Sequence, residues 1–141
     1  MKKYNLLLVV FIFMIAFFLA FCNDESGTAA DPLDGTSWVL FAYRKSKPIP
    51  ETTITATFEN GQIHGSTGCN SYSGVYSITG GKISFENVAS TLMACLDPEG
   101  IMEQEQLIMQ FIGDAQAYRL SDGQLMIFRS DDEALTFVPG G

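Results

Sequence analysis

The sequence predicts an α+β fold: a mostly antiparallel, curved sheet of about eight strands, or a small barrel, with one helix packed against it. Three tight turns, Asn60-Gly61, Gly80-Gly81 and Asp122-Gly123, each separate two β-like segments and supply residues that tolerate positive φ. Over residues 52–59, apolar and threonine side chains alternate, which is the period of a half-buried strand. Only one segment of the domain has helical periodicity instead.

The expected strands follow one another along the chain and mostly flank the tight turns. Hairpin neighbours pair antiparallel, so most of the sheet should be antiparallel. The first strand is apolar on both alternating faces, which favours a central position. The expected ranges are 38–44, 52–59, 62–66, 74–79, 82–87, 117–120, 124–129 and 134–138.

One helix is expected between the fifth and sixth strands. Asp97 can cap its N-terminus, Pro98 suits the first helical position, and Gly113 is its expected end. One face of the helical wheel is polar and the other apolar, so the apolar stripe should pack on the sheet. The stripe contains Ile101, Ile108, Ile112 and Ala115, widened by Met102, Met109 and Phe111.

An unbroken apolar run over residues 6–21 follows two lysines and ends at Cys22. Residues 1–22 therefore have the pattern of a lipoprotein signal segment, in which cleavage frees the cysteine for lipidation. Phe21 departs from this pattern, because a small residue usually precedes the cysteine. An uncleaved signal anchor is the alternative, although sixteen apolar residues fall short of the about 20 that a spanning helix needs. Both interpretations predict a membrane-anchored protein on the extracytoplasmic face of the cell envelope.

Residues 23–34 are small and polar, which predicts a flexible tether between the membrane and a domain at 35–139. Without the two leader lysines, six basic residues stand against sixteen acidic ones, a net charge of −10. Such a chain repels a phosphate backbone, and no basic cluster offsets the repulsion. Nucleic acid is therefore not an expected partner.

Cys69 and Cys95 remain once Cys22 is assigned to the anchor. Outside the cytoplasm two thiols in one small domain usually pair, and closing this loop would stabilise by roughly 3.5 kcal/mol in the chain-entropy model. A metal site with His64, the only histidine, and a pair of buried free thiols are the alternatives. A disulfide is favoured, and we expect no metal and no cofactor.

Glu105 lies within the apolar stripe of the helix instead of on its polar face. It is either a general acid or base, or a structural carboxylate that accepts hydrogen bonds. The structural role is favoured, with partners expected in residues 67–70 or 90–93, because no nucleophile or metal ligand stands beside it. Since the chain has no hydrolase, metalloprotease or nucleotide-binding motif, we expect no catalytic residues.

Several blocks of the domain resemble the META domain, also called the HslJ-like domain. The resemblance covers residues 33–138 and is specific because the blocks occur together and in order. It implies structural roles for Trp38, Thr67, Gly68, Asn70, Thr91, Met93 and Glu105. The blocks are Gly35-Thr36-Ser37-Trp38-Val39-Leu40, Gly65-Ser66-Thr67-Gly68-Cys69-Asn70-Ser71-Tyr72-Ser73-Gly74-Val75-Tyr76, Ala89-Ser90-Thr91-Leu92-Met93-Ala94-Cys95, and Met102 with Glu105.

The resemblance implies more about location than about mechanism. Members of this family are commonly bacterial envelope proteins or lipoproteins, including a heat-inducible protein linked to novobiocin tolerance, and others occur in trypanosomatids. No enzymatic activity is established for them. We therefore expect a non-enzymatic envelope protein that binds an envelope partner or supports tolerance of heat or antibiotics. The alternatives are a small-molecule binder, whose curved sheet encloses an apolar cavity, and an inhibitor of an extracellular hydrolase.

Overall fold

The computed structural model describes residues 30–129 and 133–141 of the chain. The signal segment and Cys22 lie outside these residues, as does most of the predicted tether. Within the described residues, no helix has the length and hydrophobicity to cross a membrane.

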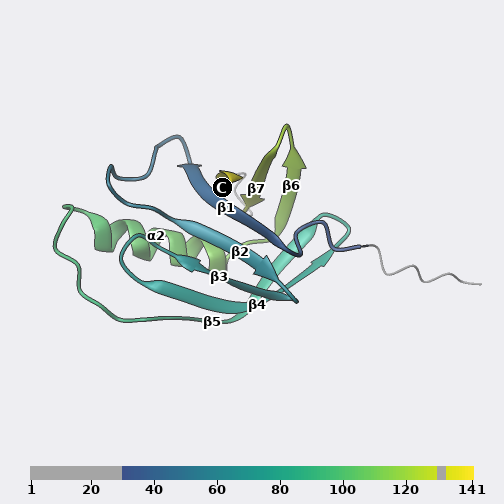
Figure 1. Cartoon of the computed structure of the whole chain (residues 1–141), viewed down its shortest axis with the longest axis horizontal. Helices are drawn as coiled ribbons and strands as arrows, with labels where there is room; N and C mark the ends of the chain where they lie inside the picture. Colours follow the sequence, from purple (N-terminus) through teal and green to yellow (C-terminus); the bar gives the residue numbers. More distant parts are fainter. Residues whose placement is uncertain (1–29, 130–132) are drawn as a thin grey trace, which may run out of the picture. The chain divides into compact units, whose positions relative to one another are not determined.

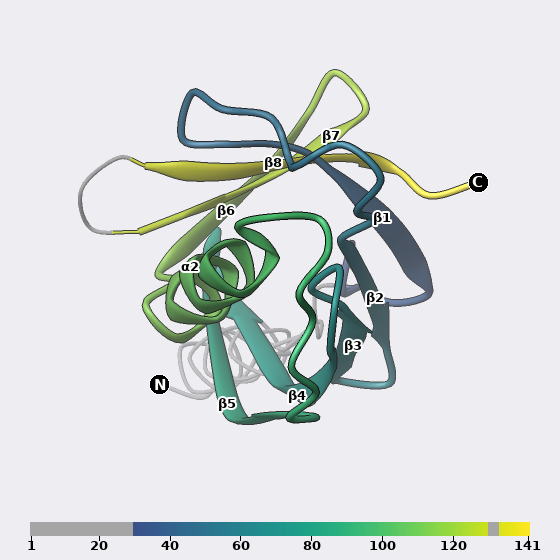
Figure 2. The same cartoon turned by 90° about the vertical axis from the view of Figure 1, so that its left-hand side faces the viewer.

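In this part of the chain, eight antiparallel strands close into a barrel, in which each strand pairs with the next and the last returns to the first (Figures 1 and 2). The predicted α+β class, in its small-barrel form, is confirmed. Closure leaves the first strand with a neighbour on each side, as its apolar sequence predicted. The strands are β1 (Thr36–Tyr43), β2 (Thr55–Glu59), β3 (Gln62–Ser66), β4 (Ser71–Thr79), β5 (Lys82–Ser90), β6 (Ala117–Ser121), β7 (Gln124–Phe128) and β8 (Ala134–Pro139).

The β4–β5 hairpin is longer at its open end than the sequence predicted. The pairing continues to Tyr72 opposite Ser90, past a register shift opposite Gly74. Asn87 has a φ of 53° in this bulge, and a Cβ at Gly74 would lie 2.9 Å from a side-chain carbon of Val88. Gly74 and Asn87 look like strand ends in the sequence, but here they form a bulge inside the hairpin.

The helix α2 (Ile101–Gly113) begins three residues later than a helix with Pro98 at its first position would. Gly100 precedes it with a φ of 85°, and no side chain caps the first turn, so the prediction of an Asp97 cap was wrong. A left-handed residue cannot continue a right-handed helix, so the helix can begin only after Gly100. The end at Gly113 was predicted correctly.

The helix α2 covers the place where β5 and β6 separate (Figure 2). These strands share one residue pair, Lys82 with Ala117, whereas the other neighbouring strands pair over three to seven residues. Ile108, Phe111 and Ile112 of α2 are buried in the barrel core, as the apolar stripe predicted. Met102, also assigned to the stripe, is 36 % exposed.

The barrel interior is packed with apolar side chains from all around the sheet. Phe58, Leu125 and Leu135 are fully buried, and Trp38 is 8 % exposed with its indole N–H donating to the Thr36 hydroxyl at 2.8 Å. Phe58 and Tyr76 meet edge to face, with ring centroids 4.9 Å apart. These side chains belong to one continuous core cluster, with the close packing that protein interiors have in general.

The last four residues of the predicted tether belong to the domain. Leu33 is fully buried in the core, Asp31 accepts a hydrogen bond from the Tyr76 hydroxyl at 2.6 Å, and Asp34 accepts one from the backbone N–H of Asn60 at 2.6 Å. The compact unit accordingly begins at Asp31. The sequence boundary at residue 35 was placed too late, because a single leucine among small polar residues gave no sign of burial.

Candidate functional site

Glu105 accepts three hydrogen bonds at one end of the barrel. The backbone N–H of Asn70 donates to it at 3.0 Å, the Asn70 amide at 2.9 Å and the Thr67 hydroxyl at 2.5 Å. Thr67 and Asn70 are almost completely buried, and Glu105 is 8 % exposed. The partners lie in residues 67–70, one of the two blocks predicted, and their number provides the compensation that a buried carboxylate requires.

The Asn70 side chain connects this carboxylate to the segment that follows β5. Its amide group donates to Glu105 and to the Met93 carbonyl at 3.0 Å, while its oxygen accepts from the Met93 N–H at 2.8 Å and the Thr91 hydroxyl at 2.7 Å. These bonds use both donors and both acceptor sites of the side chain. We call Thr67, Asn70, Thr91, Met93 and Glu105 the Asn70 cluster.

A disulfide between Cys69 and Cys95, with Cα atoms 6.0 Å apart, lies beside the Asn70 cluster. The structure thus agrees with the predicted disulfide and contradicts both alternatives, because bonded sulfurs are neither free thiols nor thiolate ligands. His64 lies on β3 in register with Thr57 and Ser73, and it is exposed. Among the described residues no group of three potential ligands gathers to hold a metal.

Gln104 is a buried polar residue that the sequence analysis missed. Its side chain accepts from the Ile49 N–H at 2.7 Å and donates to the Thr52 hydroxyl at 3.1 Å, which ties the β1–β2 connection to α2. Gly68, with a φ of 102°, lies against both Thr52 and Gln104. Its burial could have been predicted from its position on the helical wheel, because residue 104 falls on the apolar stripe beside Glu105.

Next to the Asn70 cluster and the disulfide, the loop 91–96 exposes apolar side chains. Leu92 is 94 % exposed, Leu96 92 % and Met93 56 %. Met102 joins them from the first turn of α2, where its sulfur accepts from the backbone N–H of Cys95 at 3.4 Å. We call Leu92, Met93, Leu96 and Met102 the apolar apex. Met93 serves the Asn70 cluster only through its backbone, so the structural role that the resemblance implied does not extend to its side chain.

The surroundings of the apolar apex are acidic. Asp97, Glu99 and Glu103 are exposed, and the sequence contains no Lys, Arg or His from Ile83 to Tyr118. The ion pairs between described residues lie elsewhere, at Arg44 and Arg129. The residues that follow the apex loop in the chain are therefore rich in exposed carboxylates, and the segment that carries the apex has no basic residue.

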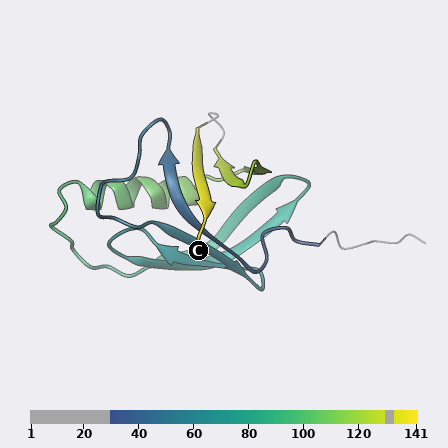
Figure 3. The same cartoon turned by 45° about the horizontal axis from the view of Figure 1, so that its top comes forward.

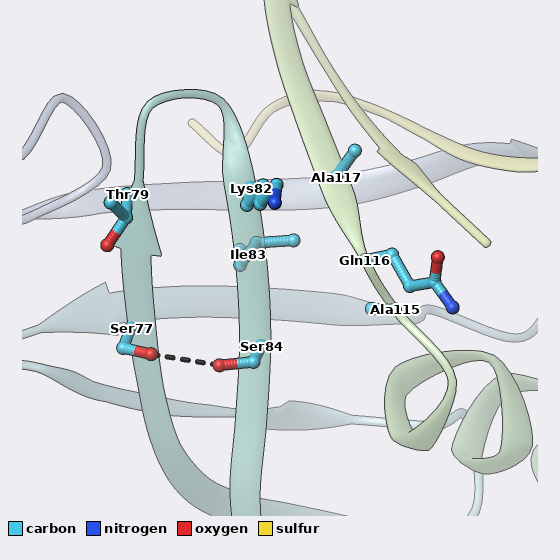
Figure 4. Close-up of a pocket in the computed structure, with 8 residues that line it drawn as sticks. All are labelled: Ser77, Thr79, Lys82, Ile83, Ser84, Ala115, Gln116 and Ala117. Carbon is cyan, nitrogen blue, oxygen red and sulfur yellow. Dashed lines mark hydrogen bonds between the residues drawn. The ribbon is translucent and has the colours of Figure 1, made fainter. Parts of the chain in front are cut away.

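A hollow of about 600 Å³ lies outside the core, where β5 and β6 meet (Figure 4). Its lining is mainly apolar surface, to which Ile83, Ala115 and Ala117 contribute, and exposed polar side chains surround it; the hydroxyls of Ser77 and Ser84 bond to each other at 2.9 Å. A second hollow of about 410 Å³ adjoins it at Ala115 and Gln116. Both are open at the surface, in contrast to the enclosed apolar cavity expected of a small-molecule binder.

An eight-stranded antiparallel barrel with one inserted helix, held at one end by a buried Glu–Asn cluster and a disulfide, defines the class of domain. The chain belongs to the META domain family, whose model matches residues 31–140. The resemblance seen in the sequence is thereby confirmed at the family level.

Three solved structures illustrate the fold. An NMR structure of a protein from Burkholderia xenovorans is 27 % identical, with a TM-score of 0.63, over 84 % of this chain and 96 % of that one. A second NMR structure is 24 % identical, with a TM-score of 0.62, over 76 % and 91 % of the two chains. A crystal structure of a DUF4847 family protein from Bacteroides vulgatus is 12 % identical, with a TM-score of 0.57, over 76 % and 94 %. The last two show the fold alone.

No curated protein matches the chain. Neither the family nor these structures gives any sign of catalytic activity.

Proposed function

We propose that this protein is a non-enzymatic interaction domain of the cell envelope, anchored through lipid on Cys22, which binds a protein partner through the apolar apex in support of tolerance to heat or antibiotics. The observation that carries the proposal is the exposure of Leu92 and Leu96, each above 90 %. Leu92, Met93 and Leu96 are exposed within five residues of one loop, and contiguous exposed apolar side chains mark interaction sites, whereas scattered ones need no explanation.

The bonding around the loop 91–96 supports this proposal. The backbone of Met93 is fixed by two hydrogen bonds to Asn70, and Cys95 is fixed by the disulfide. A loop held in this way loses little conformational freedom on binding, so less of its interaction energy is spent on ordering. Two leucines on a loop held at two points fit recognition of a partner better than they fit stability.

The position of the apex relative to the chain entry also supports the proposal. Asp31 bonds to Tyr76, which lies five residues along β4 from Ser71, while Ser71 pairs with Thr91 at the start of the loop. Five residues of strand span about 17 Å. Figures 1 and 3 show the coloured segment that precedes β1 and the β5–α2 connection at opposite ends of the domain. Within the domain, the apex therefore lies away from the residues at which the described chain begins.

Complementation of cells that lack the protein tests the function. The variant Leu92→Ser/Leu96→Ser should reach the envelope at the normal level, keep its melting temperature, and fail to restore growth under heat or antibiotic. The matched control Phe41→Ser/Val75→Ser changes two apolar side chains that are 49 % and 47 % exposed on β1 and β4, and it should restore growth. Full restoration by the Leu92/Leu96 variant would overturn the proposal.

The anchor is tested separately by the intact mass of protein purified from the envelope. Lipidation predicts loss of residues 1–21 and a gain of acyl mass on Cys22. Two or more acyl chains provide durable attachment, whereas one gives only marginal binding. An intact leader with an unmodified thiol would instead establish a signal anchor.

A small-molecule binder is the second candidate, and the hollow at the β5–β6 junction is the observation that favours it. Lys82 and Gln116 supply a charge and an amide there, beside the hydroxyls of Ser77, Thr79 and Ser84. Lys82→Ala/Gln116→Ala should abolish stress tolerance under this alternative and leave it intact under the main proposal. An inhibitor of an extracellular hydrolase is a form of the main proposal, with the apex entering an enzyme cleft.

A further inference from the structure

We propose that the partner surface is an apolar pocket bordered by Lys and Arg side chains on another protein of the envelope. This inference rests on the proposed function and adds the chemistry of the partner. It follows from the negative charge of the segment that carries the apolar apex.

The charge is one-sided over the whole segment that builds the apex. From Ile83 to Tyr118 the sequence has six acidic residues and no basic ones. Three of the acidic residues, Asp97, Glu99 and Glu103, are exposed beside Leu96 and Met102 in the chain. Charges at the rim of an interface are matched by opposite charges on the partner, which steer encounter and exclude wrong partners. The rim of the partner pocket should therefore be basic.

Two other occupants of the apex fit these charges poorly. A bilayer with anionic lipids has a negative surface potential, which repels the same carboxylates. A second copy of this chain, paired symmetrically through the apex, would bring three carboxylates against three others. A basic protein surface is the occupant that the charges favour.

The size of the apex suits insertion into a pocket. Its three loop residues lie within five positions of the chain, and Met102 adds a flexible side chain. A few buried side chains commonly provide most of the binding energy at an interface, while the surrounding polar contacts exclude water. Leu92 and Leu96 are the side chains we expect to enter the pocket.

Site-specific photocross-linking in living cells tests the inference with the full-length protein. A benzophenone amino acid is placed at position 92 or 96, and at position 75 on β4 as the control site. We expect a cross-linked protein adduct from 92 or 96 and none of that mass from 75. Asp97→Lys/Glu99→Lys should reduce the adduct by about tenfold, because two attractions become repulsions. The matched control Glu59→Lys/Glu86→Lys makes the same charge change elsewhere and should leave the adduct unchanged.

The outcomes separate this inference from the function on which it rests. Absence of any protein adduct from positions 92 and 96 would overturn the proposed function itself. An adduct that is unaffected by Asp97→Lys/Glu99→Lys would overturn the basic pocket and leave the interaction function standing. An adduct with lipid, or one with the mass of two copies of this chain, would also overturn the basic pocket. In isolated envelopes, the adduct should weaken when salt is raised, because exposed charge pairs are screened.

Discussion

The side chain of Asn70 joins three segments that are distant in the sequence. It holds the β3–β4 connection, the loop 91–96 and α2 together with four hydrogen bonds, in a place where it is 1 % exposed. Two of these bonds need a donor and two need an acceptor. Only an amide of this length supplies both, which makes the identity of the residue more important than its size.

Asn70→Asp should therefore destabilise the domain although it conserves shape. A carboxylate at this position would face the Glu105 carboxylate and the Met93 carbonyl with lone pairs instead of N–H groups. We expect a loss of about 3 kcal/mol in the free energy of unfolding, as for an unpaired buried charge. Urea unfolding followed by fluorescence of Trp38, the only tryptophan, measures it. Asn87→Asp, an exposed change, should have little effect, and equal stabilities of the two variants would contradict this account.

Glu105→Ala tests the other half of the Asn70 cluster. Removing the carboxylate leaves the Asn70 N–H, the Asn70 amide and the Thr67 hydroxyl without one of their partners in a buried site. The expected cost is at least about 1–3 kcal/mol. Thermal unfolding compares it with Glu103→Ala, an exposed change on the same helix that should stay within about 0.5 kcal/mol of the original. An unchanged melting temperature for Glu105→Ala would show that Glu105 does not stabilise the domain.

At the scale of elements, local signals in the sequence were sufficient for the hairpins. The turns at Asn60-Gly61, Gly80-Gly81 and Asp122-Gly123 were predicted because their residues determine the backbone on their own. The length of the β4–β5 hairpin was not predicted, because pairing across a bulge depends on residues nearly twenty positions apart. For the helix, Asp97 and Pro98 gave a capping signal that Gly100, in a left-handed conformation, prevented from operating.

The candidate site was predictable only in part, for the same reason. The Cys69–Cys95 pair and the contacts of Glu105 followed from two rules: thiols outside the cytoplasm pair, and buried carboxylates need donors. The buried role of Gln104 and the exposure of Leu92 and Leu96 were not foreseen. Both depend on what the rest of the chain places opposite these residues, and leucine is among the residue types most often buried.

The disulfide is the covalent connection between the β3–β4 turn and the loop 91–96. It joins two residues with a sequence separation of 26, and in the chain-entropy model it stabilises the fold mainly by reducing the conformational entropy of the unfolded chain. Cys69→Ala/Cys95→Ala should lower the free energy of unfolding by about 3.5 kcal/mol, or the melting temperature by about 15 °C. Calorimetry of the variant and of the parent protein under reducing conditions should give matching shifts. Unaltered melting temperatures in both would show that the disulfide does not stabilise the domain.

At the scale of the whole molecule, two tyrosines of β4 point into the closed barrel. Tyr72 and Tyr76 are each 4 % exposed; the Tyr72 hydroxyl donates to the Thr55 carbonyl at 2.9 Å and the Tyr76 hydroxyl to Asp31. Burial raises the pKa of both well above the ordinary value of 10.0, and the hydrogen bond and negative charge of Asp31 raise that of Tyr76 further. Because the folded barrel keeps both side chains neutral, it must lose stability at any pH at which the unfolded chain releases their protons.

The barrel should therefore unfold in alkali. Below pH 10 both states bind the tyrosine protons and these groups give no pH dependence, whereas above it the unfolded state binds fewer. Stability should thus fall as pH rises from about 10, by about 1.4 kcal/mol per pH unit for each tyrosine that stays protonated in the folded state. Urea midpoints between pH 8 and 11.5 measure the slope. Tyr72→Phe loses a hydrogen bond, so its free energy of unfolding should be lower at pH 8. Above pH 10, however, its stability should fall with pH about half as steeply as that of the parent protein. Equal slopes would mean that Tyr72 ionises without unfolding the barrel.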